Sequence, residues 1–171
     1  MRSRLVTNLI LLAVIVVLVM ATLTELKPEK AVPTAITQLD TQTVSSIELT
    51  RRGKPPLRFA KQQEEWVMLS PENGKANQEK VKNLLTISQI NSSSQFPLNS
   101  EKADRFGLKE PAITLKLGGL LIMVGDIAPI SQQRYLRIGE TLYLVTDNFY
   151  HHLIAQPSQY LAATALKRAA D

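Results

Sequence analysis

A chain of 171 residues has room for one ordinary domain and one additional element. It contains no cysteine, which excludes structural disulfides, thiolate metal sites and a cysteine nucleophile. The formal net charge is +5, and apart from Arg51-Arg52-Gly53-Lys54, which is typical of a solvated hairpin, the basic excess of the domain is spread along the chain, so we expect no nucleic-acid partner.

The first predicted element is a membrane-spanning helix over residues 5–23. This run is almost wholly apolar and contains no charge, glycine or proline. Its 19 residues match the length needed for the hydrocarbon core of a bilayer. Arg2 and Arg4 precede it, so the positive-inside rule places residues 1–4 in the cytoplasm and the rest of the chain outside. A cleaved signal peptide, with Val19-Met20-Ala21 at the cleavage site, is the alternative.

An extracytoplasmic domain is expected over residues 44–171, after a linker. Residues 24–43 contain two prolines and no sustained apolar period, which predicts an extended linker. Apolar alternation and turn residues predict strands over 44–49, 57–61 and 65–69. Asn77 is a suitable N-cap for a helix that runs to about Ile90.

The second half of the domain repeats this order. The polar run 91–95 predicts a surface loop, and a short turn of helix before Gly107 follows it. Strands are predicted over 113–117, 120–124, 134–138 and 142–145, and helices over 147–154 and 158–169. The predicted fold class is therefore α+β: an N-terminal transmembrane helix and an antiparallel-sheet domain of two β-meanders, each followed by helix.

An ordered set of short motifs carries a family resemblance. The motifs are Ile47-Glu48-Leu49, Trp66-Val67-Met68-Leu69-Ser70-Pro71, Arg105-Phe106-Gly107-Leu108-Lys109-Glu110-Pro111, Val124-Gly125-Asp126 with Pro129, and Tyr135-Leu136-Arg137. Together they resemble the domain-of-unknown-function family 4340 of membrane-anchored bacterial envelope proteins. Related domains occur beside auxiliary subunits of gliding-motility-type ABC transport systems. The resemblance implies a membrane protein complex as partner and implies no catalytic residues.

The residues themselves predict no enzyme, cofactor or metal site. His151 and His152 are adjacent and point in different directions, so one metal ion cannot easily take both. Val124-Gly125-Asp126 lacks the glycine pattern of a phosphate-binding loop, and Glu64-Glu65 is typical of solvated charge at a strand end. Trp66 is typical of a core residue rather than a sugar-stacking platform.

The predicted interaction surface combines a strand with the C-terminal region. Its residues are Arg134, Tyr135, Arg137, Tyr160 and Leu161, and we expect Tyr135 to point opposite to the two arginines. The hypothesis is a non-enzymatic interaction module at the inner membrane, in contact with lipid through residues 5–23. It would serve as an accessory component of an envelope or transport assembly. The alternative is an extracytoplasmic ligand-binding module for a glycan or small solute, which requires a concave pocket with convergent polar groups.

Overall fold

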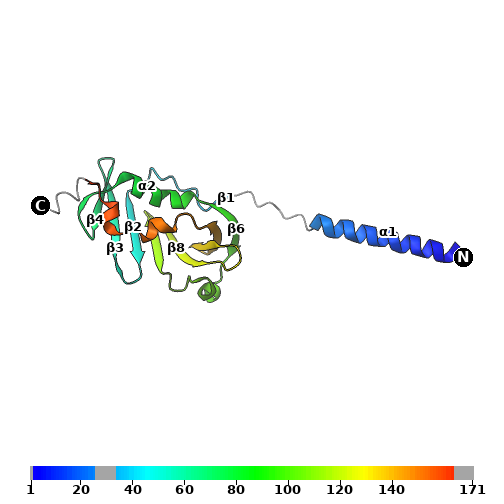
Figure 1. Cartoon of the computed structure of the whole chain (residues 1–171). Coiled ribbons are helices and arrows are strands. Elements are labelled where there is room, and N and C mark those ends of the chain that lie inside the picture. The colour runs from blue at the N-terminus through cyan, green and yellow to red at the C-terminus, as the bar shows by residue number, and fades with distance from the viewer. Residues whose placement is uncertain (1, 26–33, 164–171) are drawn as a thin grey trace. The chain divides into compact units, whose positions relative to one another are not determined.

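A computed structural model describes residues 2–25 and 34–163 of the chain (Figure 1). The chain divides into two compact units, Met1–Val32 and Pro33–Asp171. The first unit contains helix α1, which runs from Arg2 to Glu25. The second unit contains the sheet and the remaining helices.

Helix α1 covers the run for which a membrane span was predicted. Asn8 and residues 10–20, whose side chains are described, are exposed. No helix in the described residues is long and apolar enough to cross a membrane. We therefore correct the prediction of a transmembrane helix over residues 5–23.

The described part of the second unit forms one ten-stranded antiparallel sheet with the order β1-β6-β10-β9-β8-β7-β2-β3-β4-β5 (Figure 1). Two meanders, β2–β5 and β7–β10, join where β2 pairs with β7. The strands are β1 (Thr34–Ala35), β2 (Ser46–Arg51), β3 (Lys54–Gln62), β4 (Glu65–Ser70), β5 (Gly74–Lys75), β6 (Asn91–Pro97), β7 (Ile113–Leu117), β8 (Leu120–Ile127), β9 (Gln133–Ile138) and β10 (Thr141–Thr146).

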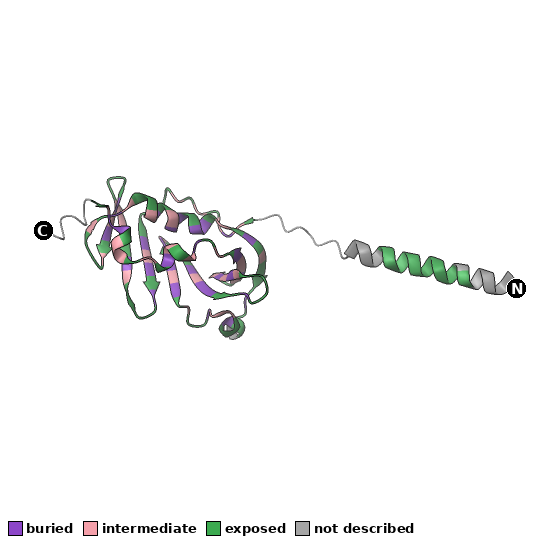
Figure 2. Ribbon diagram, in the orientation of Figure 1, coloured by how far each residue is buried: buried purple, intermediate pink, exposed green. Residues whose placement is uncertain are grey.

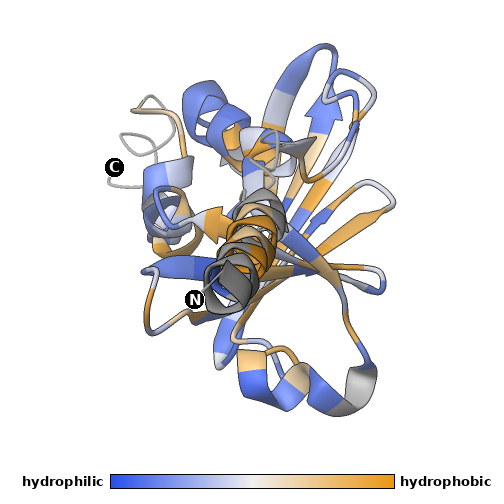
Figure 3. Cartoon of the chain, turned by 90° about the vertical axis from the view of Figure 1, so that its right-hand side faces the viewer, coloured by the Kyte–Doolittle hydropathy of each residue, from blue (hydrophilic) through white to orange (hydrophobic). Residues whose placement is uncertain are grey.

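The main core lies on one face of this sheet, because alternate strand residues point to the same side (Figure 2). Ile47 and Leu49 of β2, for example, are buried. Figure 3 shows hydrophobic and hydrophilic residues interspersed along the strands. The helical elements that contribute side chains to this core are α2 (Gln78–Thr86), η1 (Ile87–Gln89), α3 (Tyr150–Ile154) and η3 (Pro157–Tyr160).

A smaller core lies on the opposite face, beneath η2 (Ser100–Phe106). Leu136 of β9 belongs to the main core, whereas its neighbour Tyr135 packs against the smaller one. Consecutive strand residues point to opposite faces, so the two cores lie on the two sides of the sheet. The buried members of the smaller core are Leu98, Ala103, Leu108 and Leu142.

Two glycines allow η2 to approach β8 closely. A Cβ atom on Gly125 would lie 2.3 Å from the Phe106 carbonyl oxygen. A Cβ atom on Gly107, which has φ +66°, would lie 2.5 Å from the carboxyl carbon of Asp126. A side chain at position 125 would therefore push η2 away from the sheet, whereas one at position 107 would displace the Asp126 carboxylate and would have to adopt an unfavourable positive φ.

At the β4–β5 end of the sheet, the side chain of Gln78 and the backbone of Ala162 occupy the outer hydrogen-bonding groups. The amide of Gln78 accepts a hydrogen bond from the N–H of Trp66 at 2.9 Å and donates one to its carbonyl oxygen at 3.0 Å. The Ala162 N–H donates to the Lys75 carbonyl at 2.9 Å on the far side of β5. Few edge groups of β4 and β5 are thus left for a further strand.

The predicted α+β class with an N-terminal transmembrane helix is wrong, because the described residues form a mostly antiparallel β-sheet with few helices. The run 91–95, predicted as a loop, lies in β6. Ser92 there is buried, and its single hydroxyl proton is shared between the carbonyl oxygens of Ser94 and Leu144, at 2.6 and 3.1 Å from the hydroxyl oxygen. Hydrogen bonds from the serine hydroxyls and from the backbone thus hold β6 in the sheet, although it lacks the alternating apolar side chains from which strands were predicted.

The boundaries of the compact unit also differ from the expected ones. The unit begins at Pro33, whereas the sequence placed the domain start at residue 44. Ile36 is buried, and its N–H donates to the Ile90 carbonyl at 2.9 Å. At the C-terminal side, η3 stands where the helix 158–169 was predicted to begin. Residues 26–33 of the predicted linker and 164–169 of that helix lie outside the described residues.

Candidate functional site

The first wall of the candidate site is formed by α2 and η1. The Asn77 side chain caps α2 by accepting a hydrogen bond from the Lys80 N–H at 3.2 Å. Val81, Leu84 and Leu85 face the core and fix the rotation of the helix. Residues three apart share a helix side, so the uncharged polar side chains at positions 83 and 86 are presented together.

The second wall is the connection from the end of β10 to α3. Phe149 is buried in this connection and anchors it to the main core. Asp147 accepts two hydrogen bonds from Arg134, each of 2.7 Å, which fixes the backbone beside the wall. Thr146 and Asn148, on either side of Asp147, are exposed.

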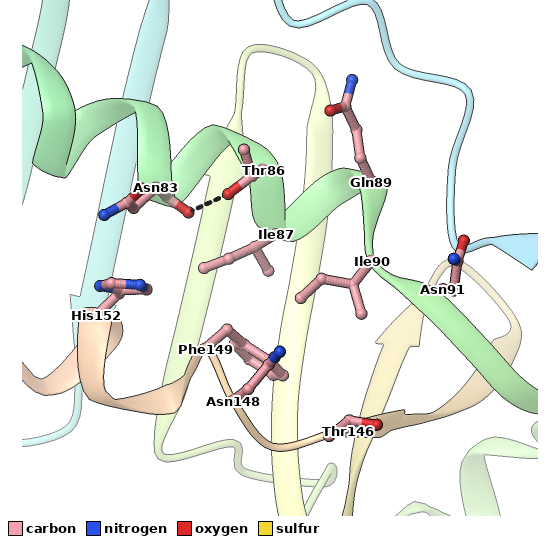
Figure 4. A pocket seen from close by; sticks show the side chains of 10 residues that line it. All are labelled: Asn83, Thr86, Ile87, Gln89, Ile90, Asn91, Thr146, Asn148, Phe149 and His152. Atoms are coloured by element: carbon pink, nitrogen blue, oxygen red, sulfur yellow. Dashed lines mark hydrogen bonds between the residues drawn. The ribbon is translucent and has the colours of Figure 1, made fainter.

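The two walls enclose a pocket of about 580 Å³ (Figure 4). This volume falls within the usual range for small-molecule sites. No lining side chain is a carboxylate, an ammonium or a guanidinium. The lining residues are Asn83, Thr86, Ile87, Gln89, Ile90, Asn91, Thr146, Asn148, Phe149 and His152.

The polar rim of the pocket has unused hydrogen-bonding capacity. The Thr86 hydroxyl donates to the Asn83 backbone carbonyl at 2.9 Å. The side-chain amides of the remaining rim residues bond to no protein group within the described residues; they belong to Asn83, Gln89, Asn91 and Asn148. Each amide offers two donors and an accepting oxygen to a bound molecule. The buried side chains of Ile87 and Phe149 give the pocket an apolar floor.

His152 is the titratable residue of the pocket. Burial lowers its pKa from the ordinary value, and the neighbouring charges of His151 and Lys80 lower it further. The rings of His151 and His152 lie with centroids 3.9 Å apart. Groups of three or more His, Cys, Asp or Glu that could hold a metal ion do not occur within residues 2–25 and 34–163. The lowered pKa favours the neutral imidazole, so His152 adds donor and acceptor capacity rather than charge.

Arg134, a member of the predicted interaction surface, is buried and fully engaged. In addition to its ion pair with Asp147, its Nη1 donates to the Gly125 carbonyl at 2.8 Å. The guanidinium lies 3.7 Å from the ring centroid of Tyr150. Arg134 therefore joins β8, β9 and α3, and it is not presented to a partner.

The other four residues of the predicted surface do not form one patch. Tyr135 packs edge-on against Phe106, with ring centroids 4.8 Å apart. Arg137 donates to the Gly139 carbonyl at 2.8 Å. Arg137 and Tyr135 stand two positions apart in β9, so their side chains lie on the same face of the sheet. The expectation that both arginines point opposite to Tyr135 is therefore wrong for Arg137. Tyr160 and Leu161 are buried on the other face, in the main core.

Tyr160 contacts several parts of the main core. Its ring packs against Phe59, with centroids 5.5 Å apart, and its hydroxyl donates to the His152 carbonyl. Burial raises the pKa of Tyr160 to about 12, and the charge of Arg51 opposes this rise. Tyr160 thus stabilises the position of α3 behind the pocket.

The remaining sequence motifs have structural positions. Trp66 is buried in β4 and belongs to the main core. Glu64 and Glu65 form ion pairs with Lys61 and Lys75 at the exposed β3–β4 hairpin and β5. Gly125 lies against the Phe106 carbonyl at the end of η2, and Asp126 lies against Gly107, the residue that follows η2.

Sequence reasoning missed the pocket, although one of its walls left a trace. Uncharged polar residues recur at positions 83, 86 and 89, a spacing that keeps them on one side of a helix. The second wall lies about sixty residues later in the chain. Only the fold of α2 onto the same sheet face as α3 brings the two walls together.

Comparisons with family models, curated proteins and solved structures found no match for this chain. The resemblance to the domain-of-unknown-function family 4340 therefore stays a prediction.

Proposed function

We propose that this protein is a binding module for an uncharged ligand rich in hydroxyl and amide groups, a neutral saccharide, held in the pocket between α2–η1 and the β10–α3 connection. The observation that carries the proposal is the composition of the lining. Amide and hydroxyl side chains form the rim, buried apolar side chains form the floor, and no formal charge is present.

The rim matches the chemistry of a saccharide. A sugar hydroxyl both donates and accepts hydrogen bonds, and so does a side-chain amide. Asn83 and Asn148 come from opposite walls and can contact two sides of one ring (Figure 4). The C–H face of a sugar ring suits the apolar floor beneath them. A charged ligand would lose water there without gaining a counter-charge.

The proposal selects the ligand-binding alternative that the sequence left open. The residues predicted as a docking surface favour it indirectly, because three of them are buried: Arg134, Tyr160 and Leu161. The extracytoplasmic location, the inner-membrane assembly and an ABC-transporter-like partner stay predictions from the sequence.

Nuclear magnetic resonance titration of the full-length ¹⁵N-labelled protein tests the proposal. The neutral probes are maltotriose and tri-N-acetylchitotriose, and the charged comparison ligands are glucosamine and glucuronate. We expect one or both neutral probes to shift the side-chain amide signals of Asn83 and Asn148. The charged monosaccharides should leave them unchanged up to equal concentration.

Two pocket variants and a matched control sharpen this test. Asn83→Ala and Asn148→Ala should each weaken binding by about two- to tenfold, the effect of losing one hydrogen bond of about 0.5–1.5 kcal/mol. Asn73→Ala removes an exposed amide outside the pocket and should leave the affinity unchanged. Shifts that survive both pocket variants, or no shift with either neutral probe, would refute the proposed function.

A further inference from the structure

The two ends of the pocket differ in the groups that can carry a charge. Figure 4 shows His152 at one end, below Asn83, whereas Asn91 and Thr146 lie at the other end. Among the described residues that line the pocket, His152 alone titrates near physiological pH. The pocket therefore gains a formal charge only at the His152 end.

Two further basic side chains lie beside His152. Its ring centroid is 3.9 Å from that of His151, which is exposed. Lys80 stands three residues before Asn83 and therefore shares its side of α2. A proton on His152 thus adds a positive charge beside other basic groups.

The carboxylates around this end of the pocket do not pair with that charge. Asp147 has both oxygens engaged in its ion pair with a guanidinium, and Glu79 of α2 is exposed to solvent. Behind α3, Tyr160 is neutral and donates its hydroxyl to the His152 carbonyl, while Arg51 adds a further positive charge. A protonated His152 has no anionic partner within the described residues.

We propose that the pocket binds a second class of ligand in acid, a saccharide that carries a carboxylate, whose charge pairs with protonated His152 at the Asn83 end. The inference rests on the proposed function, because the rim amides and the apolar floor hold the sugar ring in both cases. With a neutral imidazole, the pocket offers the carboxylate no counter-charge and disfavours it. The imidazolium supplies that counter-charge and a charge-assisted hydrogen bond.

The direction of the pH dependence follows from the surroundings of His152. Burial lowers the pKa of His152 from its ordinary value of 6.5, and the charges of His151 and Lys80 lower it further. The imidazole is therefore neutral at about pH 7.5 and becomes protonated only in acid. The carboxylate of the ligand is still ionised there, because ordinary carboxyl groups titrate near pH 4, at about 3.3–4.3. By linkage, a ligand that prefers the protonated form raises the pKa of His152 when it binds.

Nuclear magnetic resonance titration of the full-length ¹⁵N-labelled protein with glucuronate tests the inference at about pH 7.5 and about pH 5. The signals are the side-chain amide of Asn83 and the imidazole of His152. Glucuronate should bind at least about fivefold more tightly at the lower pH, as expected for a hydrogen bond between charged groups. It should also raise the pKa of His152. Glucose lacks the carboxylate and should show no such gain, and acetate lacks the ring and should leave the Asn83 signal unchanged.

Two adjacent substitutions provide a matched pair. His152→Gln keeps a polar side chain in the pocket but cannot take up the proton, so the gain in affinity for glucuronate should disappear. His151→Gln removes the neighbouring exposed imidazole, which does not line the pocket, and should keep most of the gain. An equal gain in both variants, no gain in the parent, a pKa of His152 that glucuronate does not raise, or equal shifts with acetate would each overturn the inference.

The neutral trisaccharides, titrated at about pH 7.5, decide the proposed function separately. If they bind and glucuronate shows no gain in acid, the inference fails and the proposed function stands. If glucuronate binds in acid through His152 and neither neutral probe binds, the proposed function fails and the carboxylate site stands.

Discussion

The two meanders each contain a buried arginine, and the two arginines have opposite surroundings. Arg134 of β9 is 7% exposed and forms a bidentate ion pair with Asp147. Arg51 of β2 is 6% exposed, and it forms no ion pair with any described residue. Its Nη1 donates to the Ala155 carbonyl at 2.6 Å, while its Nε has no hydrogen-bond partner within the described residues.

This difference shows that equal burial does not mean equal contribution to stability. A buried charge with a counter-ion and satisfied donors can be replaced only at a cost, because its partner is then left uncompensated. A buried charge without a counter-ion already carries a desolvation cost in the folded state. Arg51 recovers part of that cost at the C-terminal end of α3, where the helix dipole favours a cation.

The largest effect should come from removing the counter-ion of Arg134. Asp147→Ala should lower the unfolding free energy by about 3–5 kcal/mol, because it leaves the guanidinium buried without a partner. Urea denaturation of the full-length protein, followed by Trp66 fluorescence, measures this change. Asp104→Ala removes an exposed carboxylate and should change stability by less than about 0.5 kcal/mol. Equal effects of the two variants would contradict the importance of this ion pair.

The next effect concerns the same meander, at the contact between η2 and β8. Gly125→Ala should destabilise the protein by about 1–3 kcal/mol, because the new methyl group meets the Phe106 carbonyl and η2 must shift. Gly119→Ala is the matched control in the β7–β8 turn, where no atom lies within 4 Å of an added Cβ. Its stability should remain within about 0.5 kcal/mol of the parent. If both variants unfold at the urea midpoint of the parent, the close approach of Gly125 to the Phe106 carbonyl does not limit the size of the residue at position 125.

A smaller loss of stability is expected from removing the buried hydroxyl of Tyr160, which lies near Arg51 in the main core. Tyr160→Phe should cost about 1 kcal/mol at neutral pH, through the lost hydrogen bond to the His152 carbonyl. The parent should also lose stability as the pH rises from 10 to 12, because the unfolded chain releases the phenol proton first while the folded pKa is about 12.

The pH dependence separates this phenol from other titrating groups. Tyr160→Phe should lack that component, so its deficit relative to the parent should shrink, and then reverse, by up to about 1.4 kcal/mol per pH unit in this range. Parallel pH profiles of the two proteins in urea would contradict a buried, neutral Tyr160.

The smallest effect should come from Arg51 itself. Arg51→Met keeps the volume of the side chain and removes a charge without a described counter-ion, so stability should stay within about 1 kcal/mol of the parent. Arg134→Met, which strands Asp147, should cost at least about 2 kcal/mol in the same urea assay. A large loss for Arg51→Met would reveal an acidic partner and would remove the contrast between the two meanders.

The sequence by itself predicted the strands that carry an apolar alternation. The strands predicted over 113–117 and 134–138 coincide with β7 and β9, and the Asn77 cap stands at the start of α2. These features depend on neighbouring residues only, since a strand period of two and a helix cap are both read within one turn or one strand.

Where the information is not local, the predictions were wrong. β6 is a strand because β10 offers a backbone ladder and the serine hydroxyls find carbonyl acceptors, although its own residues resemble a loop. Tyr160 and Leu161 resembled an exposed docking surface, but residues 160–162 lie against the β5 segment and the main core.

The candidate sites follow the same division. The sequence determined the uncharged polar side chains at positions 83, 86, 89 and 91 and at positions 146 and 148. Only the tertiary structure decided that these two sets of side chains face each other across one pocket. The physical reason is that a side chain's chemistry is set by its residue type, whereas its neighbours are set by strand pairing between residues far apart in the chain.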